Sequence, residues 1–351
     1  MRTTLTAVLT ATILWGLLAP TAAMAQSDLV YLASGAPKRG TITAMTPTEV
    51  KFEINGTEQA YAVNEIKQLK FTDEPNALNN ARNAVGEKNF NSALTELDKI
   101  NVAELKRDME KQEVAFLRAY CQAQQAMTEG GDKTAAANAM LDFVRATSKN
   151  HYRFYQAAET LGDLMVASGK FDEAAKYYGE TGLAGAPWPT YKLQANLALG
   201  RSQYLGGKFD DALKSYDAVI VSELSTPETN LLKEFAKAGK GACLAENGQP
   251  DEGIALIKKV IQDNDPKEKR LFAYANNALG NCYLKTSRPK DALLAFLQTH
   301  LMFFGDGDTH AEALFQLARL GDSLDRPEIA SDARETLRQR FAGSHWLARQ
   351  Q

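Results

Sequence analysis

Two histidines and two aspartates lie in one short stretch near the C-terminal end of the chain, and side chains of these types can hold a divalent cation. His300 and His310 flank the sequence Asp306-Gly307-Asp308. Imidazole suits zinc, whereas carboxylate oxygens suit calcium or magnesium. The stretch lacks the full ligand set of a calcium loop, and a Gly/Asp-rich turn between two helices accounts for the same residues. We therefore expect a turn here and no metal.

The three cysteines are the next candidates, because a thiol can act as a nucleophile or form a disulfide. Cys121, Cys243 and Cys282 are odd in number and have no framework spacing. Each follows a small residue by two positions, so all three share one register. A small apolar side chain packed between neighbouring helices explains that register, and the three thiols are predicted to be core residues. A disulfide or a reactive thiol is the alternative.

The chain carries none of the common enzyme signatures. It has no G-x-S-x-G elbow, no glycine-rich phosphate loop and no H-E-x-x-H helix. Its 351 residues include 40 basic and 43 acidic side chains, a formal net charge of −3. That balance gives no general attraction to nucleic acid or anionic lipid. The sequence predicts a protein that is not an enzyme, with no catalytic residue, no cofactor and no nucleic-acid partner.

Residues 1–25 have the pattern of a signal peptide. Arg2 supplies the positive end, residues 5–18 form an apolar run, and Ala23-Met24-Ala25 is a cleavage site that would leave Gln26 as the first mature residue. An uncleaved anchor is the alternative. No later segment is apolar enough to span a membrane. We expect an exported bacterial protein, periplasmic or secreted.

Residues 26–72 differ from the rest of the chain, because their apolar residues alternate. Val50, Phe52 and Ile54 follow a period of two, and Asn55-Gly56 is a strong hairpin signal. The segment predicts about five short strands with one apolar face. It resembles a small SH3-like or Sm-like β-barrel, and its role is left open.

Residues 73–351 are predicted to be helical throughout and to repeat. A small residue recurs at steps of 38 to 43 residues, at Ala81, Ala119, Gly162, Gly200, Gly241, Gly280 and Ala318. A second small residue follows most of these anchors by twelve positions, and a larger residue follows four positions later. The second unit fits only if its turn, residues 128–134, holds about six extra residues. Two helices can touch only where Gly or Ala leaves room, so the pattern predicts about seven helical hairpins.

The order Leu-Gly, aromatic, Ala, aromatic resembles the tetratricopeptide repeat. The resemblance implies a mostly α protein, an α-solenoid of stacked hairpins behind the β domain. The residues expected to pack the hairpins are Gly162, Ala174, Tyr178, Gly200, Ala212, Tyr216, Gly241, Gly280, Tyr283, Ala292 and Phe296. Thr309 and Glu312 are expected to form a capping box before the last hairpin. An arginine-rich C-terminal helix is expected to cap the array with a polar face.

In the resembling family, ligands lie along the concave face formed by the first helix of each hairpin. The positions that correspond to this face are Glu159, Asp163, Arg201, Tyr204, Asn277, Asn281, Lys285, Phe315 and Arg319. The resemblance implies a protein-binding scaffold of the periplasm or cell envelope that holds a partner peptide or helix in this groove. A structural or glycan-binding envelope protein, with Trp188 as an aromatic platform, is the alternative. The sequence leaves the oligomeric state open.

Overall fold

A computed structural model describes residues 27–350 of the chain, apart from residue 129. The predicted signal peptide, residues 1–25, lies outside the described residues and stays a prediction. None of the described helices combines the length and the apolar composition that crossing a membrane requires.

The first described residues form an antiparallel sheet of five strands, as predicted. The strands are β1 (Asp28–Leu32), β2 (Lys38–Met45), β3 (Glu49–Ile54), β4 (Thr57–Ala62) and β5 (Ile66–Lys70), in the order β4-β3-β2-β1-β5. Val50 and Phe52 are fully buried and their neighbours are not, because successive side chains of a strand point to opposite faces. Asn55 and Gly56 both have positive φ and form the predicted two-residue turn between β3 and β4.

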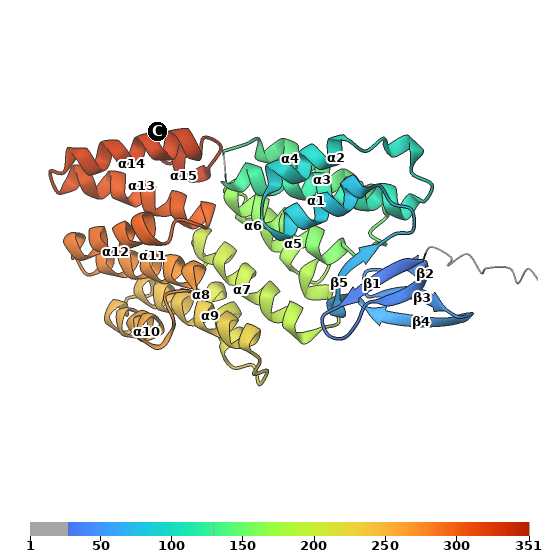
Figure 1. Ribbon diagram of the computed structural model, residues 1–351. Helices are drawn as coiled ribbons and strands as arrows, with labels where there is room; N and C mark the ends of the chain where they lie inside the picture. The colour runs from blue at the N-terminus through green and yellow to red at the C-terminus, as the bar shows by residue number, and fades with distance from the viewer. Residues whose placement is uncertain (1–26, 129, 351) are drawn as a thin grey trace, which may run out of the picture.

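Fifteen helices follow in the described part of the chain, and the first fourteen form the seven predicted hairpins (Figure 1). The hairpins are α1 (Asn76–Gly86) with α2 (Phe90–Asp98), α3 (Asp108–Thr128) with α4 (Lys133–Ala146), α5 (Phe154–Ala167) with α6 (Phe171–Tyr178), α7 (Pro189–Leu205) with α8 (Phe209–Ile220), α9 (Pro227–Glu246) with α10 (Pro250–Asp263), α11 (Lys269–Lys285) with α12 (Pro289–Met302), and α13 (Gly307–Ser323) with α14 (Pro327–Arg340). A short last helix, α15 (His345–Ala348), follows them.

In three hairpins the two helices meet where a glycine of the first helix faces an aromatic ring of the second: Gly162 with Tyr178, Gly200 with Tyr216 and Gly280 with Phe296. A Cβ atom added at Gly162 would lie 2.3 Å from the Tyr178 ring, and one added at Gly280 would lie 2.6 Å from the Phe296 ring. Ala174, twelve residues after Gly162, is fully buried beside this contact. The close approach therefore needs a glycine at that point of the first helix and a large side chain on the second.

Two predicted details of the array are corrected. The extra residues of the second unit lengthen α3, which has 21 residues, instead of enlarging the turn behind it. The last hairpin is capped by Asp306, whose side chain accepts a hydrogen bond from the Thr309 backbone N–H; Thr309 and Glu312 are inside α13. The helix begins at Gly307, so Asp306 has the N-cap position, and its carboxylate accepts from the N–H group of Thr309, the third residue of the helix.

The solenoid closes on itself. A Cβ atom added at Gly307, at the start of α13, would lie 2.4 Å from the carbonyl oxygen of Met127 at the end of α3. The His345 Nδ1 atom lies 3.4 Å from the carbonyl oxygen of Ala167 at the end of α5. Figure 1 accordingly shows the last helices beside α4 and α6. An open solenoid has contacts only between neighbouring repeats, whereas here the seventh hairpin lies against the second and the last helix, α15, lies against the third.

Buried ion pairs join the sheet to the first hairpins. Arg107, just before α3, donates to both carboxylate oxygens of Asp28 on β1 at 2.7 and 2.8 Å. Glu113 on α3 is 0% exposed and accepts from Arg82, Arg153 and the Tyr152 hydroxyl. Burial alone would raise the pKa of Glu113, but the two guanidinium groups lower it to about 2. The first three hairpins thus share one charged network.

Candidate binding cavity

A cavity with a volume of about 600 Å³ opens on the inner side of the closed solenoid. It lies between the C-terminal end of α7, the first helices α11 and α13, and the short helix α15. Its lining mixes aromatic rings, amides and charged side chains. The lining residues are Tyr204, Leu205, Gly207, Phe209, Glu246, Asn281, Leu284, Lys285, Glu312, Phe315, Gln316, Arg319, Trp346 and Arg349.

Two arginines and two aromatic rings form a ladder along one wall of the cavity. The rings of Phe315 and Trp346 lie 5.5 Å apart, centroid to centroid. The Arg319 guanidinium lies 5.5 Å from the Phe315 centroid, and the Arg349 guanidinium lies 4.9 Å from the Trp346 centroid. Neither arginine pairs with a carboxylate within the described residues, and both are exposed. The ladder holds two positive charges in place by cation–π contact and leaves their N–H groups free.

The other charged residues of the lining are already paired. The Lys285 ammonium lies 2.6 Å from the Glu246 carboxylate. The Glu312 carboxylate accepts hydrogen bonds from the amides of Asn277 and Asn281, at 3.1 and 3.0 Å. Burial raises the pKa of Glu312, against the lowering effect of Arg201 and these amides. The available charge of the cavity is therefore that of the two ladder arginines.

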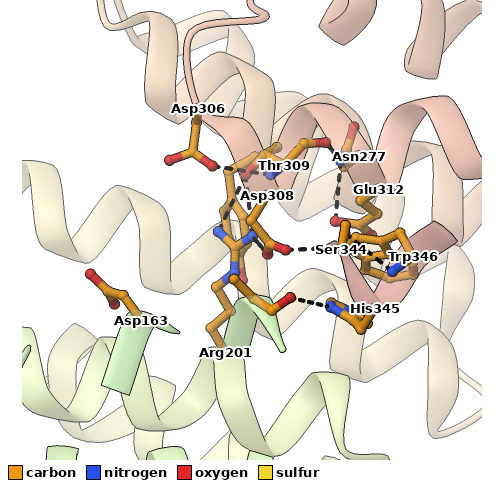
Figure 2. Close-up of polar contacts among 12 residues, drawn as sticks. Asp163, Arg201, Asn277, Asp306, Asp308, Thr309, Glu312, Ser344, His345 and Trp346 are labelled. Carbon is orange, nitrogen blue, oxygen red and sulfur yellow. Dashed lines mark hydrogen bonds and ion pairs between the residues drawn. The ribbon is translucent and has the colours of Figure 1, made fainter. Parts of the chain in front are cut away.

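A second set of polar contacts closes the ring beside the cavity (Figure 2). Arg201 reaches from α7 to α13, where it pairs with the Asp308 carboxylate at 2.6 Å and with the Thr309 hydroxyl at 3.3 Å. The Trp346 indole N–H donates to the other oxygen of Asp308 at 3.3 Å. Burial alone would lower the pKa of Arg201, but the nearby carboxylates raise it. Asp308 thus joins α7, α13 and α15 at one point.

The nine predicted groove residues fall into three groups. Five of them line the cavity: Tyr204, Asn281, Lys285, Phe315 and Arg319. Two make contacts within the chain instead, because Arg201 pairs with Asp308 and Asn277, which is 2% exposed, donates to the Thr309 carbonyl oxygen. The remaining two, Glu159 and Asp163, lie outside this cavity.

Glu159 and Asp163 lie one turn apart on α5. The Tyr178 hydroxyl donates to the Asp163 carboxylate at 2.7 Å. The pKa of Glu159 is raised, first by burial and then by the neighbouring Asp163 carboxylate, and burial also raises the pKa of Asp163. Glu159 lines a smaller, separate cavity near the β sheet.

The sequence did not predict that Trp346 and Arg349 take part in the cavity. The C-terminal segment was expected to cap the array with arginines, and Arg338 and Arg340 on α14 are exposed as such a cap requires. Helix α15 instead folds inward, with Trp346 3% exposed. The signal for this was a tryptophan just after the last repeat, because so large an apolar ring is rarely left in water.

The cysteines, histidines and aspartates that were candidates for chemistry take part in packing and in contacts between helices. The three cysteines are free and buried, as predicted. Burial raises the pKa of each thiol to about 12, so they are not reactive thiolates at neutral pH. His300 and His310 stack, with 2.9 Å between their ring nitrogens, while Asp306 and Asp308 face Arg201. Within the described ranges, no three His, Cys, Asp or Glu side chains are grouped so that they could hold a metal ion.

The fold and the inward-facing cavity define the class of protein: a helical-repeat solenoid with a lined concave interior. The family model described as "Tetratricopeptide repeat" matches residues 159–223 and 240–308. These two segments run from α5 to α8 and from α9 to the start of α13, and the match confirms the resemblance to the tetratricopeptide repeat seen in the sequence.

Solved structures of the same fold agree with this assignment. A tetratricopeptide repeat protein from Parabacteroides merdae is 13% identical, with a TM-score of 0.50, over 78% of this chain and 96% of that one. NprR in complex with its cognate peptide NprX is 12% identical, with a TM-score of 0.55, over 74% of this chain and 75% of that one. No curated protein matches the chain by sequence. At these identities the likeness is one of fold.

Proposed function

We propose that the protein is a non-enzymatic, protein-binding scaffold whose inner cavity takes a peptide segment that carries an acidic side chain. The observation that carries this proposal is the ladder of Arg319, Phe315, Trp346 and Arg349. Its two guanidinium groups are unpaired within the described residues, and a carboxylate is the group that matches them bidentately. The half-buried side chains of Tyr204, Phe209 and Leu284 in the same lining offer apolar area for the rest of the segment.

Three further observations support a peptide as the occupant. A cavity of about 600 Å³ has room for a few residues and not for a folded domain. The amides of Asn281 and Gln316 lie in the same lining, where they can bond a peptide backbone. NprR, a structure of similar fold, is described in complex with a peptide.

The proposal includes a location. The pattern of residues 1–25 supports export through the cytoplasmic membrane of a bacterium, with cleavage before Gln26, and so a place in the periplasm or cell envelope. It also includes the form of the β domain. The strand order β4-β3-β2-β1-β5 and the short 3₁₀ turn before β5 support an SH3-like barrel.

The test of binding is site-specific photo-crosslinking in the native cell. A photoreactive residue is placed at Gln316, which lines the cavity, and at Glu252, which is exposed on α10, as a control position. We expect one discrete protein product from position 316 and none from position 252. The product should be lost in the Arg319→Gln/Arg349→Gln variant and kept in Arg145→Gln, a variant at an exposed arginine of α4.

Absence of a product at position 316, or a product that survives the double arginine substitution, would overturn the proposed site. Location is tested separately by osmotic-shock fractionation and N-terminal sequencing of the released protein. A sequence that starts at Gln26 in the released fraction supports export. Retention in the cytoplasm with residues 1–25 intact contradicts it.

A further inference from the structure

A second cavity lies where the β sheet meets the solenoid, with a volume of about 380 Å³. The β unit contributes one residue of the short turn before β5, and helices α5, α7 and α9 contribute the others. All of the lining side chains are polar. They are Asn64, Gln156, Glu159, Thr190, Tyr191, Gln194 and Glu228. No residue of the peptide cavity takes part, so the two cavities are independent.

Two of the amides in this lining are held in a fixed orientation by neighbours. Arg153 donates to the Gln156 side-chain oxygen at 2.9 Å, which leaves the Gln156 NH₂ group to donate. The Gln194 NH₂ group donates to Glu228 at 2.9 Å, which leaves the Gln194 oxygen to accept. Thr190, Tyr191 and Glu159 make no side-chain hydrogen bond to protein within the described residues. The cavity thus presents free donors and free acceptors together.

Aromatic rings stand behind this polar lining. The Tyr191 ring lies 5.1 Å from the Trp188 ring and 6.1 Å from the Tyr155 ring, centroid to centroid. Tyr191, which lines the cavity, therefore has its position fixed by packing, and Trp188, which packs against Tyr191, is half-buried. Aromatic faces of this kind accept the C–H groups of a flat, partly apolar ligand.

We propose that this junction cavity binds a saccharide. A sugar hydroxyl both donates and accepts, so it matches a lining that offers amide and hydroxyl donors beside carboxylate acceptors. A cationic amine would satisfy Glu159 and Glu228 but would leave the donors of Gln156, Thr190 and Tyr191 without partners, which costs binding free energy. An anion would meet two carboxylates and no lysine or arginine in the lining. The volume is at the lower end of the ligand-pocket range of about 300 to 1,000 Å³, which suits one or two sugar rings.

The test is isothermal titration of the purified protein with glucose, galactose, N-acetylglucosamine and their disaccharides, at up to about 10 mM because single sugar sites bind weakly. Intrinsic fluorescence is the second readout, and its change should disappear in the Trp188→Phe variant. The Thr190→Val/Glu228→Gln variant removes one hydroxyl and one charge from the lining without touching the core. We expect it to bind about tenfold more weakly, because the Thr190 hydroxyl can no longer bond the sugar and the acceptor at position 228 loses its charge.

The matched control is Thr181→Val/Glu252→Gln, two exposed positions outside the cavity. It should bind like the unaltered protein, and circular dichroism should show that both double variants fold. Three results would each overturn the inference: no saccharide bound in that range, equal affinity in the cavity variant and the control, or binding of spermidine with no binding of any neutral sugar. A failed crosslink at Gln316 has no bearing on this outcome, because that residue lines the other cavity.

Discussion

The contact between Arg201 and Asp308 should be the strongest single link in the closed ring. The pair joins α7 to α13 across 107 positions of sequence at 2.6 Å, with side-chain exposures of 23% and 16%. Removal of one partner from a buried pair typically costs about 3 to 5 kcal/mol, because the other charge is left unpaired. Since this pair retains some access to water, we expect Asp308→Asn to lower the free energy of unfolding by about 3 kcal/mol, at the lower end of that range.

The assay is a double-mutant cycle of Arg201→Met, Asp308→Asn and the combined variant, followed by urea unfolding. The two substitutions together should cost less than their sum by about 2 kcal/mol, because either one alone already breaks the contact between the two side chains. Hydrogen exchange of α15 should rise in both single variants, since the Trp346 indole also bonds Asp308. Asp211→Asn is the control, because its pair with Lys214 is exposed and should be worth less than about 0.5 kcal/mol.

Additive costs within about 0.5 kcal/mol would refute the reasoning, since the two side chains would then not interact. Unchanged hydrogen exchange of α15 in both single variants would refute the claim that Asp308 holds the last helix in place.

Three other substitutions test the packing, the charged network and the buried histidines. Gly200→Leu should lower the melting temperature sharply, because even a Cβ atom at this position would lie 2.8 Å from the Tyr216 ring. The control is Gly86→Ala, where an added Cβ atom would have no neighbour within 4 Å. Equal melting temperatures of the two variants would contradict the repeat packing. Glu113→Gln should cost about 3 to 5 kcal/mol by urea unfolding, and a cost below about 1 kcal/mol would show that its partners do not depend on its charge. His310 is 1% exposed, and burial lowers its pKa from 6.5 to about 3. Below pH 6.5 the unfolded chain therefore binds a proton at this histidine, whereas the folded chain does not. The contribution of this residue to the free energy of unfolding is therefore complete above pH 6.5 and is smaller by about 2 kcal/mol at pH 5. His310→Phe should remove that part of the pH dependence. If the slope of the unfolding free energy against pH does not change in this variant, the lowered pKa of His310 is contradicted.

The hairpins and the β strands could be predicted because their signals are local. Gly162 and Tyr178 are sixteen residues apart, and their contact is decided by two adjacent helices and one turn. The turn at Asn55-Gly56 is decided by two residues. In each case the residue types needed for the contact are found within one repeat or one hairpin, so the spacing alone indicates the structure.

The closure of the ring and the ladder of the cavity could not be predicted in this way. The distance between Arg201 and Asp308 depends on the rotation of each hairpin relative to the one before, added up over three hairpins. The spacing of residues in the sequence gives no information about this total rotation. The same closure explains why Arg201, chosen as a groove position by its register, contacts α13 in this structure. Asn277 contacts α13 because α11 and α13 are the first helices of neighbouring hairpins. Trp346 lies beyond the last repeat, so the repeat pattern does not predict its position.

The closed ring also limits how the chain can change its number of repeats. An open solenoid gains or loses a hairpin with little consequence, because each unit contacts only its neighbours. Here the deletion of a hairpin between α7 and α13 would move α13 by about one helix spacing, roughly 10 Å, away from its present partners on α3 and α7. Asp308 would then lose Arg201, and the wall of the inner cavity would lose α15. The number of hairpins from α3 to α14 is therefore a geometric requirement of this molecule, and duplication or loss of a repeat within that part would open the ring.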